Sequence, residues 1–186
     1  MKFGGGAMLT SLLKQSDARA GLSDVDRVSG EISATLVGRY TLSGLGRTQR
    51  TQVDVPGGRL IIERENEELA WLIPTVQAMG ELLGLPENWD SYGAHPVNPG
   101  VVSFALQLLP ETMRADTPAP AVVPTSCGGV QLEWHTRGID LEIEIRSPGR
   151  MYVSYADHQQ DTEWEGELTS DLTRLSHFIS ELSHRH

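Results

Sequence analysis

The sequence is poor in residues that cross-link a chain or carry amine chemistry. Among 186 residues there is one cysteine, Cys127, which excludes an internal disulfide framework and a cysteine-rich zinc site. Lysine occurs only at Lys2 and Lys14, so a mechanism that needs a lysine inside the folded body has no candidate beyond residue 14. The phosphate-binding loop that ends in Gly-Lys-Ser or Gly-Lys-Thr is absent.

Long apolar runs and positive charge are also scarce. No stretch approaches the ~20 apolar residues that a membrane-spanning helix needs, and the apolar patch near the start of the sequence is too short and too soon interrupted for us to expect a secretory signal. We therefore expect a cytoplasmic protein in reducing surroundings, without membrane contact. The formal net charge of −10 argues against a broad phosphate-binding surface and disfavours nucleic acid as a direct ligand.

The charge is unevenly distributed along the chain. Residues 26–64 hold six arginines and four acidic residues, whereas residues 127–167 hold three arginines and nine acidic residues. This asymmetry favours a basic protein partner or a head-to-tail contact between copies of the chain.

The length and the pattern of apolar residues predict an arm followed by a single domain. We expect residues 1–24 to form a flexible N-terminal arm and residues 25–186 to form a single α+β domain. A β-ribbon is predicted over residues 25–64, because residues 31–42 alternate between apolar and polar and two further short strands, 51–55 and 59–63, flank the turn at residues 56–58.

A pair of helices is predicted over residues 65–114. Apolar residues recur at helical spacing between residues 67 and 83, where Pro74 must either kink the helix or open its second part. Asn98 is suited to cap a second helix with Pro99 at its first position, and the apolar face of that helix continues as far as Pro110. A proline-rich connection then leads into a strand.

Residues 120–186 are predicted to form a β-meander followed by a helix. A two-residue turn at Arg137-Gly138 keeps all apolar residues of one hairpin on one side. A three-residue loop at residues 148–150 keeps the next strand on the same side, and residues 164–168 add a fourth strand. Thr169 or Ser170 is expected to cap an amphipathic helix that packs on the sheet. The predicted fold class is therefore α+β, with an antiparallel β-meander packed against helices, an N-terminal β-ribbon and a C-terminal amphipathic helix.

The hairpin register places four candidate binding residues on the polar face of the sheet. Glu133 lies opposite Glu142, and His135 lies opposite Asp140. Opposed carboxylates repel each other, so they would hold a divalent cation or an arginine-rich partner, or else form a solvated face. His135 beside Asp140 has the arrangement of an oriented general base, but no nucleophile accompanies it locally.

The stretch LPENWDSYGAHP, residues 85–96, supplies the other candidates. Trp89, Asp90, Tyr92 and His95 lie between two prolines and two predicted helices. One interpretation is a structural plug, in which Trp89 and Tyr92 seal the junction between the helices and the sheet. The other is a loop that faces a ligand or a partner, and a pure plug does not explain His95.

This stretch, together with the hairpin GGVQLEWHTRGIDLEIEI, resembles a group of small uncharacterised bacterial proteins. Their pattern is a Leu-Pro-x-x-Trp-Asp-x-Tyr-Gly-Ala loop, a helix, a proline-rich strand and a Gly-Gly hairpin ending in Leu-Glu-Trp. The resemblance runs from Leu85 to about Ile145 and does not include the N-terminal region. It implies a genuine α+β domain and brings no established activity.

Three functional hypotheses follow. The leading one is a non-enzymatic accessory or regulatory protein, whose acidic sheet face or N-terminal arm engages another protein or a second copy of the chain. The alternative is a small metal-dependent hydrolase that uses Glu133, His135, Asp140 and Glu142. A third, weaker reading is nucleic-acid binding through the arginines of the ribbon, namely Arg39, Arg47, Arg50 and Arg59. We assign no catalytic residue, no metal ligand and no cofactor.

Overall fold

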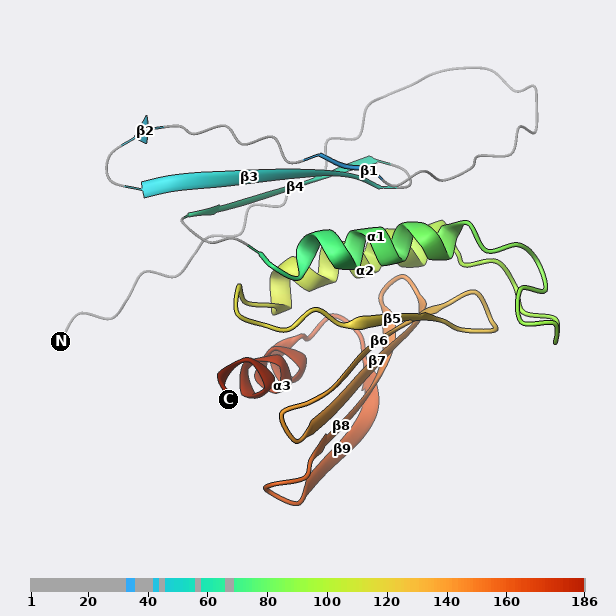
Figure 1. The fold of residues 1–186 in the computed structure, drawn as a ribbon. Helices are drawn as coiled ribbons and strands as arrows, with labels where there is room; N and C mark the ends of the chain where they lie inside the picture. Colours follow the sequence, from blue (N-terminus) through green and yellow to red (C-terminus); the bar gives the residue numbers. More distant parts are fainter. Residues whose placement is uncertain (1–32, 36–41, 44–45, 56–57, 66–68, 186) are drawn as a thin grey trace.

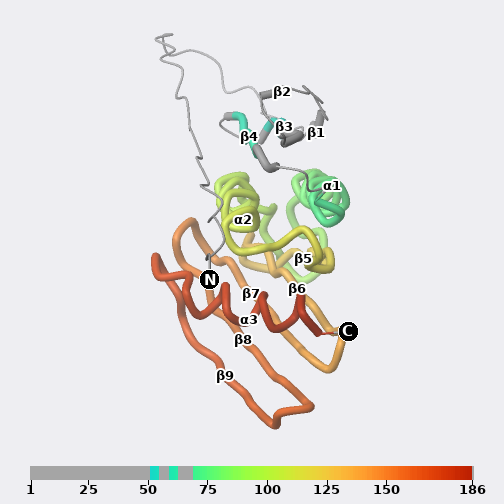
Figure 2. Tube along the Cα trace, turned by 90° about the vertical axis from the view of Figure 1, so that its left-hand side faces the viewer, coloured from blue at the N-terminus to red at the C-terminus, as the bar shows by residue number. Residues whose placement is uncertain are grey.

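The protein has three layers (Figure 1). The computed structural model describes residues 33–35, 42–43, 46–55, 58–65 and 69–185. A β-ribbon lies on one side of helices α1 (Leu72–Leu83) and α2 (Pro99–Thr112), and a five-stranded antiparallel sheet lies on the other. The view turned by 90° shows the same order of layers (Figure 2). The predicted α+β class is confirmed, whereas the predicted arm, residues 1–24, lies outside the described residues.

The ribbon consists of β3 (Gly46–Val55) and β4 (Gly58–Glu65), which pair from Val55 opposite Gly58 to Thr48 opposite Glu65. The predicted strands 51–55 and 59–63 are therefore confirmed within longer ones. The strand predicted over residues 31–42 is described only as β1 (Ser33–Thr35) and β2 (Leu42–Ser43), both of which pair with β3. Val53 and Ile62 are buried and join the core formed by the helices.

Helix α1 begins at Leu72, which is later than the apolar spacing from residue 67 indicates. Pro74 consequently lies in the first turn, where the missing proline N–H has no helical partner to lose. The second of the two predicted roles of Pro74, opening a helix, is the one observed. The indole Nε1 of Trp71, the residue before the helix, donates a 2.9 Å hydrogen bond to the carbonyl oxygen of Arg114 and so ties the start of α1 to the end of α2.

Helix α2 begins as predicted, since the Asn98 side chain accepts a hydrogen bond from Gly100 N and Pro99 is the first residue. The apolar face that was predicted as far as Pro110 is buried, and the helix itself continues to Thr112. A proline this close to the end removes little from the helical hydrogen bonding, and the Thr112 hydroxyl donates back to the Leu108 carbonyl at 3.1 Å.

The sheet has the order β5 (Ala121–Pro124), β6 (Val130–Thr136), β7 (Ile139–Ser147), β8 (Arg150–Asp157) and β9 (Thr162–Leu168). The predicted β6–β7 register is confirmed along its whole length, including Glu133 opposite Glu142 and His135 opposite Asp140. The three-residue loop predicted between β7 and β8 is wrong. Ser147 pairs with Arg150 across a two-residue turn, and a β-bulge between Ile145 and Ser147 supplies the extra residue.

The apolar face of the sheet is covered by helices. α2 contacts β6 and β7, while Phe178 of α3 (Thr173–His184) stacks on Tyr155 of β8 with ring centroids 4.1 Å apart. The predicted apolar stripe of α3 is buried. Its predicted cap at Thr169 or Ser170 is wrong, because the helix begins at Thr173, whose N–H donates to the Asp171 carboxylate.

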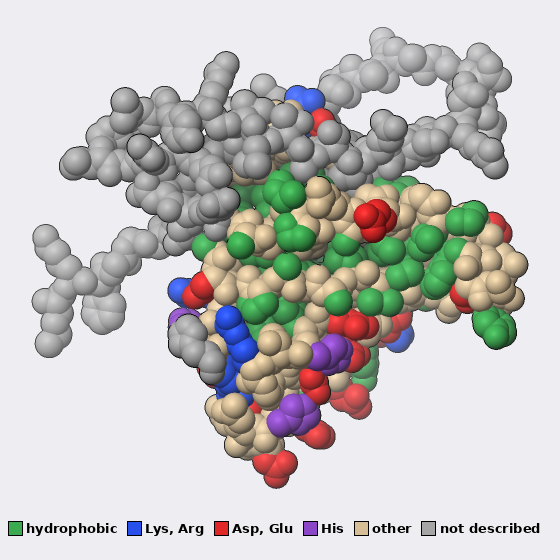
Figure 3. Space-filling view, viewed as in Figure 1, with side chains coloured by type: hydrophobic (Ala, Val, Ile, Leu, Met, Phe, Trp, Pro, Cys, Tyr) green, Lys and Arg blue, Asp and Glu red, His purple; other side chains and the backbone are tan. Residues whose placement is uncertain are grey.

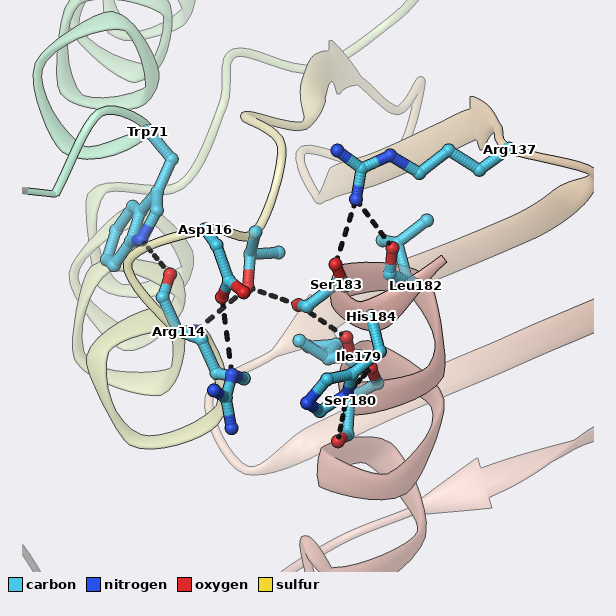
Figure 4. Close-up of polar contacts among 10 residues, drawn as sticks. Trp71, Arg114, Asp116, Arg137, Ile179, Ser180, Leu182, Ser183 and His184 are labelled. Carbon is cyan, nitrogen blue, oxygen red and sulfur yellow. Dashed lines mark hydrogen bonds and ion pairs between the residues drawn. The ribbon is translucent and has the colours of Figure 1, made fainter. Parts of the chain in front are cut away.

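The C-terminal end of α3 is held by polar groups from three distant segments (Figure 4). Arg137, in the β6–β7 turn, donates to the carbonyl oxygens of Leu182 and Ser183, both at 3.0 Å. The buried hydroxyl groups of Thr117 and Ser183 lie 2.7 Å apart. Arg185 forms an ion pair with the buried carboxylate of Asp157, which holds the pKa of that carboxyl group well below its usual range. None of the described helices covers the other face of the sheet, which presents the polar candidates.

Candidate protein-contact surface

The loop between α1 and α2 has a backbone that is fixed by hydrogen bonds. We call residues 85–96 the tyrosine loop, and it lies at the right-hand end of the helical layer in Figure 1. The Asn88 N–H donates to the Ala94 carbonyl at 2.7 Å, and the Asn88 side chain accepts from Gly93 N at 2.7 Å. The Asp90 carboxylate accepts from Tyr92 N at 2.8 Å and from Ala94 N at 3.0 Å. The side chains of Asn88 and Asp90 therefore both pair with the local backbone of the loop.

Three residues of the tyrosine loop have left-handed backbone angles. The φ angles of Asn88, Ser91 and Gly93 are 59°, 66° and 94°. Glycine adopts such angles freely, but at Ser91 the left-handed conformation is strained by roughly 1 kcal/mol or more. Strain of this kind persists only where surrounding contacts determine the conformation. The shape of the loop is therefore set by those contacts and not by the intrinsic preferences of its residues.

The tyrosine loop is also attached to the turn between β5 and β6. His95 N donates to the Ser126 carbonyl at 2.9 Å, and Asn98 N donates to the Gly128 carbonyl at 2.9 Å. A Cβ atom on Gly128 would lie 2.8 Å from the Pro96 carbonyl oxygen, so the two segments approach as closely as a glycine permits. The exposed Cys127 is at the tip of this turn.

The side chains of the tyrosine loop diverge. Tyr92 is 94% exposed, so the expectation that it seals the junction between helices and sheet is wrong. Two local contacts account for this exposure: the Asp90 carboxylate accepts a hydrogen bond from Tyr92 N, and buried Ala94 anchors the loop in the core. Residue 92 is therefore turned outwards. Trp89 is partly buried, and its indole donates to the His95 carbonyl at 3.2 Å. The exposed His95 imidazole lies 3.3 Å from the Glu87 carboxylate.

The second group of candidates lies on the open face of the sheet. Acidic and histidine side chains gather over the lower part of the molecule (Figure 3). The Asp140 carboxylate joins two imidazoles there: Oδ1 is 2.9 Å from Nδ1 of His135, and Oδ2 is 2.7 Å from Nε2 of His158. The two hydrogen bonds, first from His158 and then from His135, lower the pKa of Asp140 below its ordinary value of 3.8.

The opposed glutamates have polar partners within the chain. Nε2 of His135 lies 3.6 Å from Glu133 and 3.7 Å from Glu142, and the Gln131 amide donates to Glu142 at 3.0 Å. The hydrogen bond to Asp140, reinforced by the three nearby carboxylates, raises the pKa of His135 above its ordinary value of 6.5. We call Glu133, His135, Asp140, Glu142 and His158 the sheet cluster. It brings together all four residues predicted on this face.

His158 was missed by the sequence analysis, although the signal was present. With the predicted three-residue loop, Ser147 would pair with Met151, and the same register would set His158 directly opposite Asp140. In the observed register Asp140 pairs with Ala156, and His158 reaches Asp140 from the turn beyond β8. The imidazole was therefore within reach of Asp140 in either register.

The sheet cluster and the tyrosine loop do not form one site. The loop contacts the turn that precedes β6, whereas His135 and Asp140 lie at the other end of that strand. Among the described residues, no group of three or more His, Cys, Asp or Glu side chains is arranged to hold a metal ion. The chemistry available to the sheet cluster is proton exchange and hydrogen bonding on an exposed surface.

The arginines of the ribbon give little support to a nucleic-acid interface. Arg39 lies outside the described residues, and only the backbone is described at Arg47 and Arg50. Nε of Arg59 forms a 2.6 Å ion pair with Asp54, so part of its charge is compensated. In the part of the chain that the structure describes, no helix combines the length and apolar character needed to cross a membrane.

The comparisons with known proteins add no relative. The chain matches no family model, and neither the search of curated proteins nor the search of solved structures returned a match.

Proposed function

We propose that the protein is a non-enzymatic accessory or regulatory protein that binds another protein, or a second copy of itself, through the tyrosine loop. The observation that carries this proposal is the 94% exposure of Tyr92 on a loop whose backbone is fixed. Tyrosine is enriched among the residues that dominate binding energy at protein interfaces, because it combines a large apolar surface with a polar end.

The rigidity of the loop supports the same proposal. A contact residue on a flexible loop loses conformational entropy when it binds, and that loss offsets part of the contact energy. The backbone N–H groups of Tyr92, Gly93, Ala94 and His95 are all engaged before any partner arrives. The loop therefore holds Tyr92 ready for contact at little further entropic cost.

The sheet cluster supports the alternative hydrolase less well. Its acidic groups are already paired with His135, His158 and Gln131, and the described residues offer no arrangement for a metal ion. The imidazole of His135 lies within 3.7 Å of both opposed glutamates, at the position where their repulsion suggested a bound cation. We therefore place the contact surface on the tyrosine loop rather than on the acidic face.

The proposal is tested by site-specific photo-crosslinking. The chain is produced in its native cells with a benzophenone amino acid at position 92, and in parallel at Glu163, an exposed residue of β9. We expect one discrete adduct from position 92 and not from position 163. An adduct of twice the chain mass identifies a second copy as the partner.

The identified partner is then purified and titrated against the wild type, Tyr92→Ala and Glu163→Ala. Loss of a central interface tyrosine should weaken binding roughly 10- to 100-fold, while Glu163→Ala binds like the wild type. Equal adducts from both positions, or equal affinity of Tyr92→Ala and wild type, would show that the tyrosine loop is not the contact surface.

A further inference from the structure

The tyrosine loop lies in a long stretch of the chain that carries no positively charged residue other than histidine. Between Arg64 and Arg114 there are 49 residues, 65–113, without a lysine or an arginine. Seven acidic residues occur in the same stretch: Glu65, Glu67, Glu68, Glu81, Glu87, Asp90 and Glu111. Of these, Glu81, Glu87 and Asp90 lie in α1 or in the tyrosine loop, so the formal charge of the described chain next to Tyr92 is negative.

Two of these acidic groups belong to the loop itself. The Asp90 carboxylate accepts a hydrogen bond from the backbone N of Tyr92 at 2.8 Å, and this hydrogen bond is the main cause of a pKa below 3.8. Asp90 is consequently ionised at neutral pH. Glu87, in the same loop, is 65% exposed and lies 3.3 Å from the His95 imidazole. An exposed aromatic ring is thus presented together with a fixed carboxylate and a second carboxylate nearby.

An aromatic ring beside a carboxylate is a receptor for a guanidinium group. The face of the ring attracts a cation, and the planar guanidinium both stacks on the ring and donates hydrogen bonds to the carboxylate. Lysine offers the charge without the planar geometry. Arginine is therefore the side chain that uses both features of this surface.

The chain contains this arrangement already, on the open face of the sheet. The Arg146 guanidinium lies over the Tyr152 ring, 5.7 Å from its centroid, and donates to the Glu144 carboxylate at 2.7 Å. A second arginine, Arg174, lies 4.8 Å from the centroid of the Trp164 ring. Tyr92 and Asp90 provide a ring and a carboxylate within one loop, but Tyr92 is 94% exposed and no arginine of the described residues lies over its ring.

We infer that the partner bound by the tyrosine loop is a protein segment that lays an arginine side chain on Tyr92, with its guanidinium directed to the loop carboxylates. The inference rests on the proposed function, because it names the chemistry of the partner at that same surface. We expect the contact to resemble the internal one, in which Arg146 lies over Tyr152 and pairs with Glu144.

The test is a titration of the full chain with an acetylated Gly-Arg-Gly peptide, followed by amide chemical shifts in NMR spectra. The matched control peptide carries citrulline, which keeps the shape of arginine and removes its charge. We expect the arginine peptide to shift the signals of residues 90–94, and we expect the citrulline peptide to leave them unchanged.

The variants separate ring chemistry from apolar contact. Tyr92→Phe keeps the aromatic face and should bind the arginine peptide like the wild type, whereas Tyr92→Leu should bind it roughly two- to fivefold more weakly. Shifts that occur only on the sheet face, or equal affinities of the Phe and Leu variants, would overturn the inference. Since Tyr92 is exposed, neither variant should change the fold, and this is checked in the same spectra.

The two proposals fail in different ways. A discrete crosslink from position 92 to a partner that is unaffected by replacing its arginines with lysine or alanine overturns the arginine inference and leaves the proposed function standing. Binding of the arginine peptide at residues 90–94, together with partner affinity that depends on one partner arginine, supports both.

Discussion

At the scale of single residues, the sheet cluster links charge to pH through His135 and Asp140. The raised pKa of His135 means that its protonated form stabilises the folded state; this contribution is fully present below pH 6.5 and is lost as the pH rises through the folded pKa. The lowered pKa of Asp140 contributes stability above pH 3.8, and that contribution is lost as the pH falls through the folded pKa. The cluster therefore stabilises the fold most between these two values.

Replacing His135 with glutamine should remove the loss of folding stability that accompanies a rise in pH. Because the imidazole is half exposed, we expect His135→Gln to lower the free energy of unfolding by less than about 1 kcal/mol near pH 6. The difference from the wild type should shrink as the pH rises through the folded pKa, above which His135 is neutral in both states. Urea unfolding at several pH values measures it, with His177→Gln on α3 as the control. A difference that grows with pH would contradict the assignment.

At the scale of elements, the contact between the tyrosine loop and the β5–β6 turn depends on Gly128. Its φ angle is 81°, and a Cβ atom would lie 2.8 Å from the Pro96 carbonyl oxygen. Gly149, in the β7–β8 turn, has a φ angle of 78° but no atom within 4 Å of the same position. Alanine substitutions at these two glycines therefore separate the energetic cost of backbone strain from that of steric overlap.

We expect Gly149→Ala to destabilise the protein by about 1 kcal/mol, from strain alone. Gly128→Ala should cost roughly 1–3 kcal/mol more, because the loop and the turn must move apart. Urea unfolding of both variants gives the difference, and amide chemical shifts at residues 91–95 report whether the loop moves. Equal destabilisation of the two variants would mean that the junction is not tight.

The end of α3 offers a second prediction at this scale. The Ser183 hydroxyl donates to the Ile179 carbonyl, and the Thr117 hydroxyl accepts from Arg114 N, so Thr117 must be the donor in the 2.7 Å contact between the two hydroxyls. Ser183→Ala leaves this buried donor without its acceptor and should cost about 1–3 kcal/mol. In a double-mutant cycle with Thr117→Val, measured by chemical unfolding, we expect a coupling of about 1 kcal/mol; strict additivity would argue against the contact.

The sequence predicts strand pairing well where a shift of register would expose apolar residues. It does not predict features that depend on contacts between distant segments. A shift of one residue between β6 and β7 would expose a whole apolar row, so the pairing of Trp134 with Leu141 was predictable. The β-bulge before Ser147 was not, since a bulge and a third loop residue have the same effect on which face a side chain occupies. The attachment of the tyrosine loop to the turn at residues 126–128, through His95 N and the Ser126 carbonyl, was not predictable either, because no local pattern encodes it.

At the scale of the whole molecule, the ribbon and the sheet lie on opposite sides of α1 and α2 (Figure 1), and one set of buried apolar residues runs through all three layers. Val53 of the ribbon and Trp134 of the sheet belong to this core. The single domain predicted for residues 25–186 remains a prediction, and it implies that the layers unfold together.

Removing the two methyl groups of Val53 in the ribbon tests whether the ribbon and the sheet unfold together. Val53→Ala should lower the free energy of unfolding reported by tryptophan fluorescence by about 1–3 kcal/mol, through loss of buried apolar surface. Val123→Ala, at a site that is 37% exposed on β5, should change it by less than about 0.5 kcal/mol. If Val53→Ala leaves the fluorescence transition where it was, the ribbon unfolds independently of the sheet.

The central claim is that Tyr92 serves contact with a partner and not the fold. It is tested most directly by the dissociation constant of the crosslinked partner for Tyr92→Ala, in protein whose free energy of unfolding is measured alongside. The account predicts binding weakened about tenfold or more with a change in unfolding of less than about 0.5 kcal/mol. Unchanged affinity together with a loss of about 2 kcal/mol or more in stability would contradict it, because Tyr92 would then act as a structural plug.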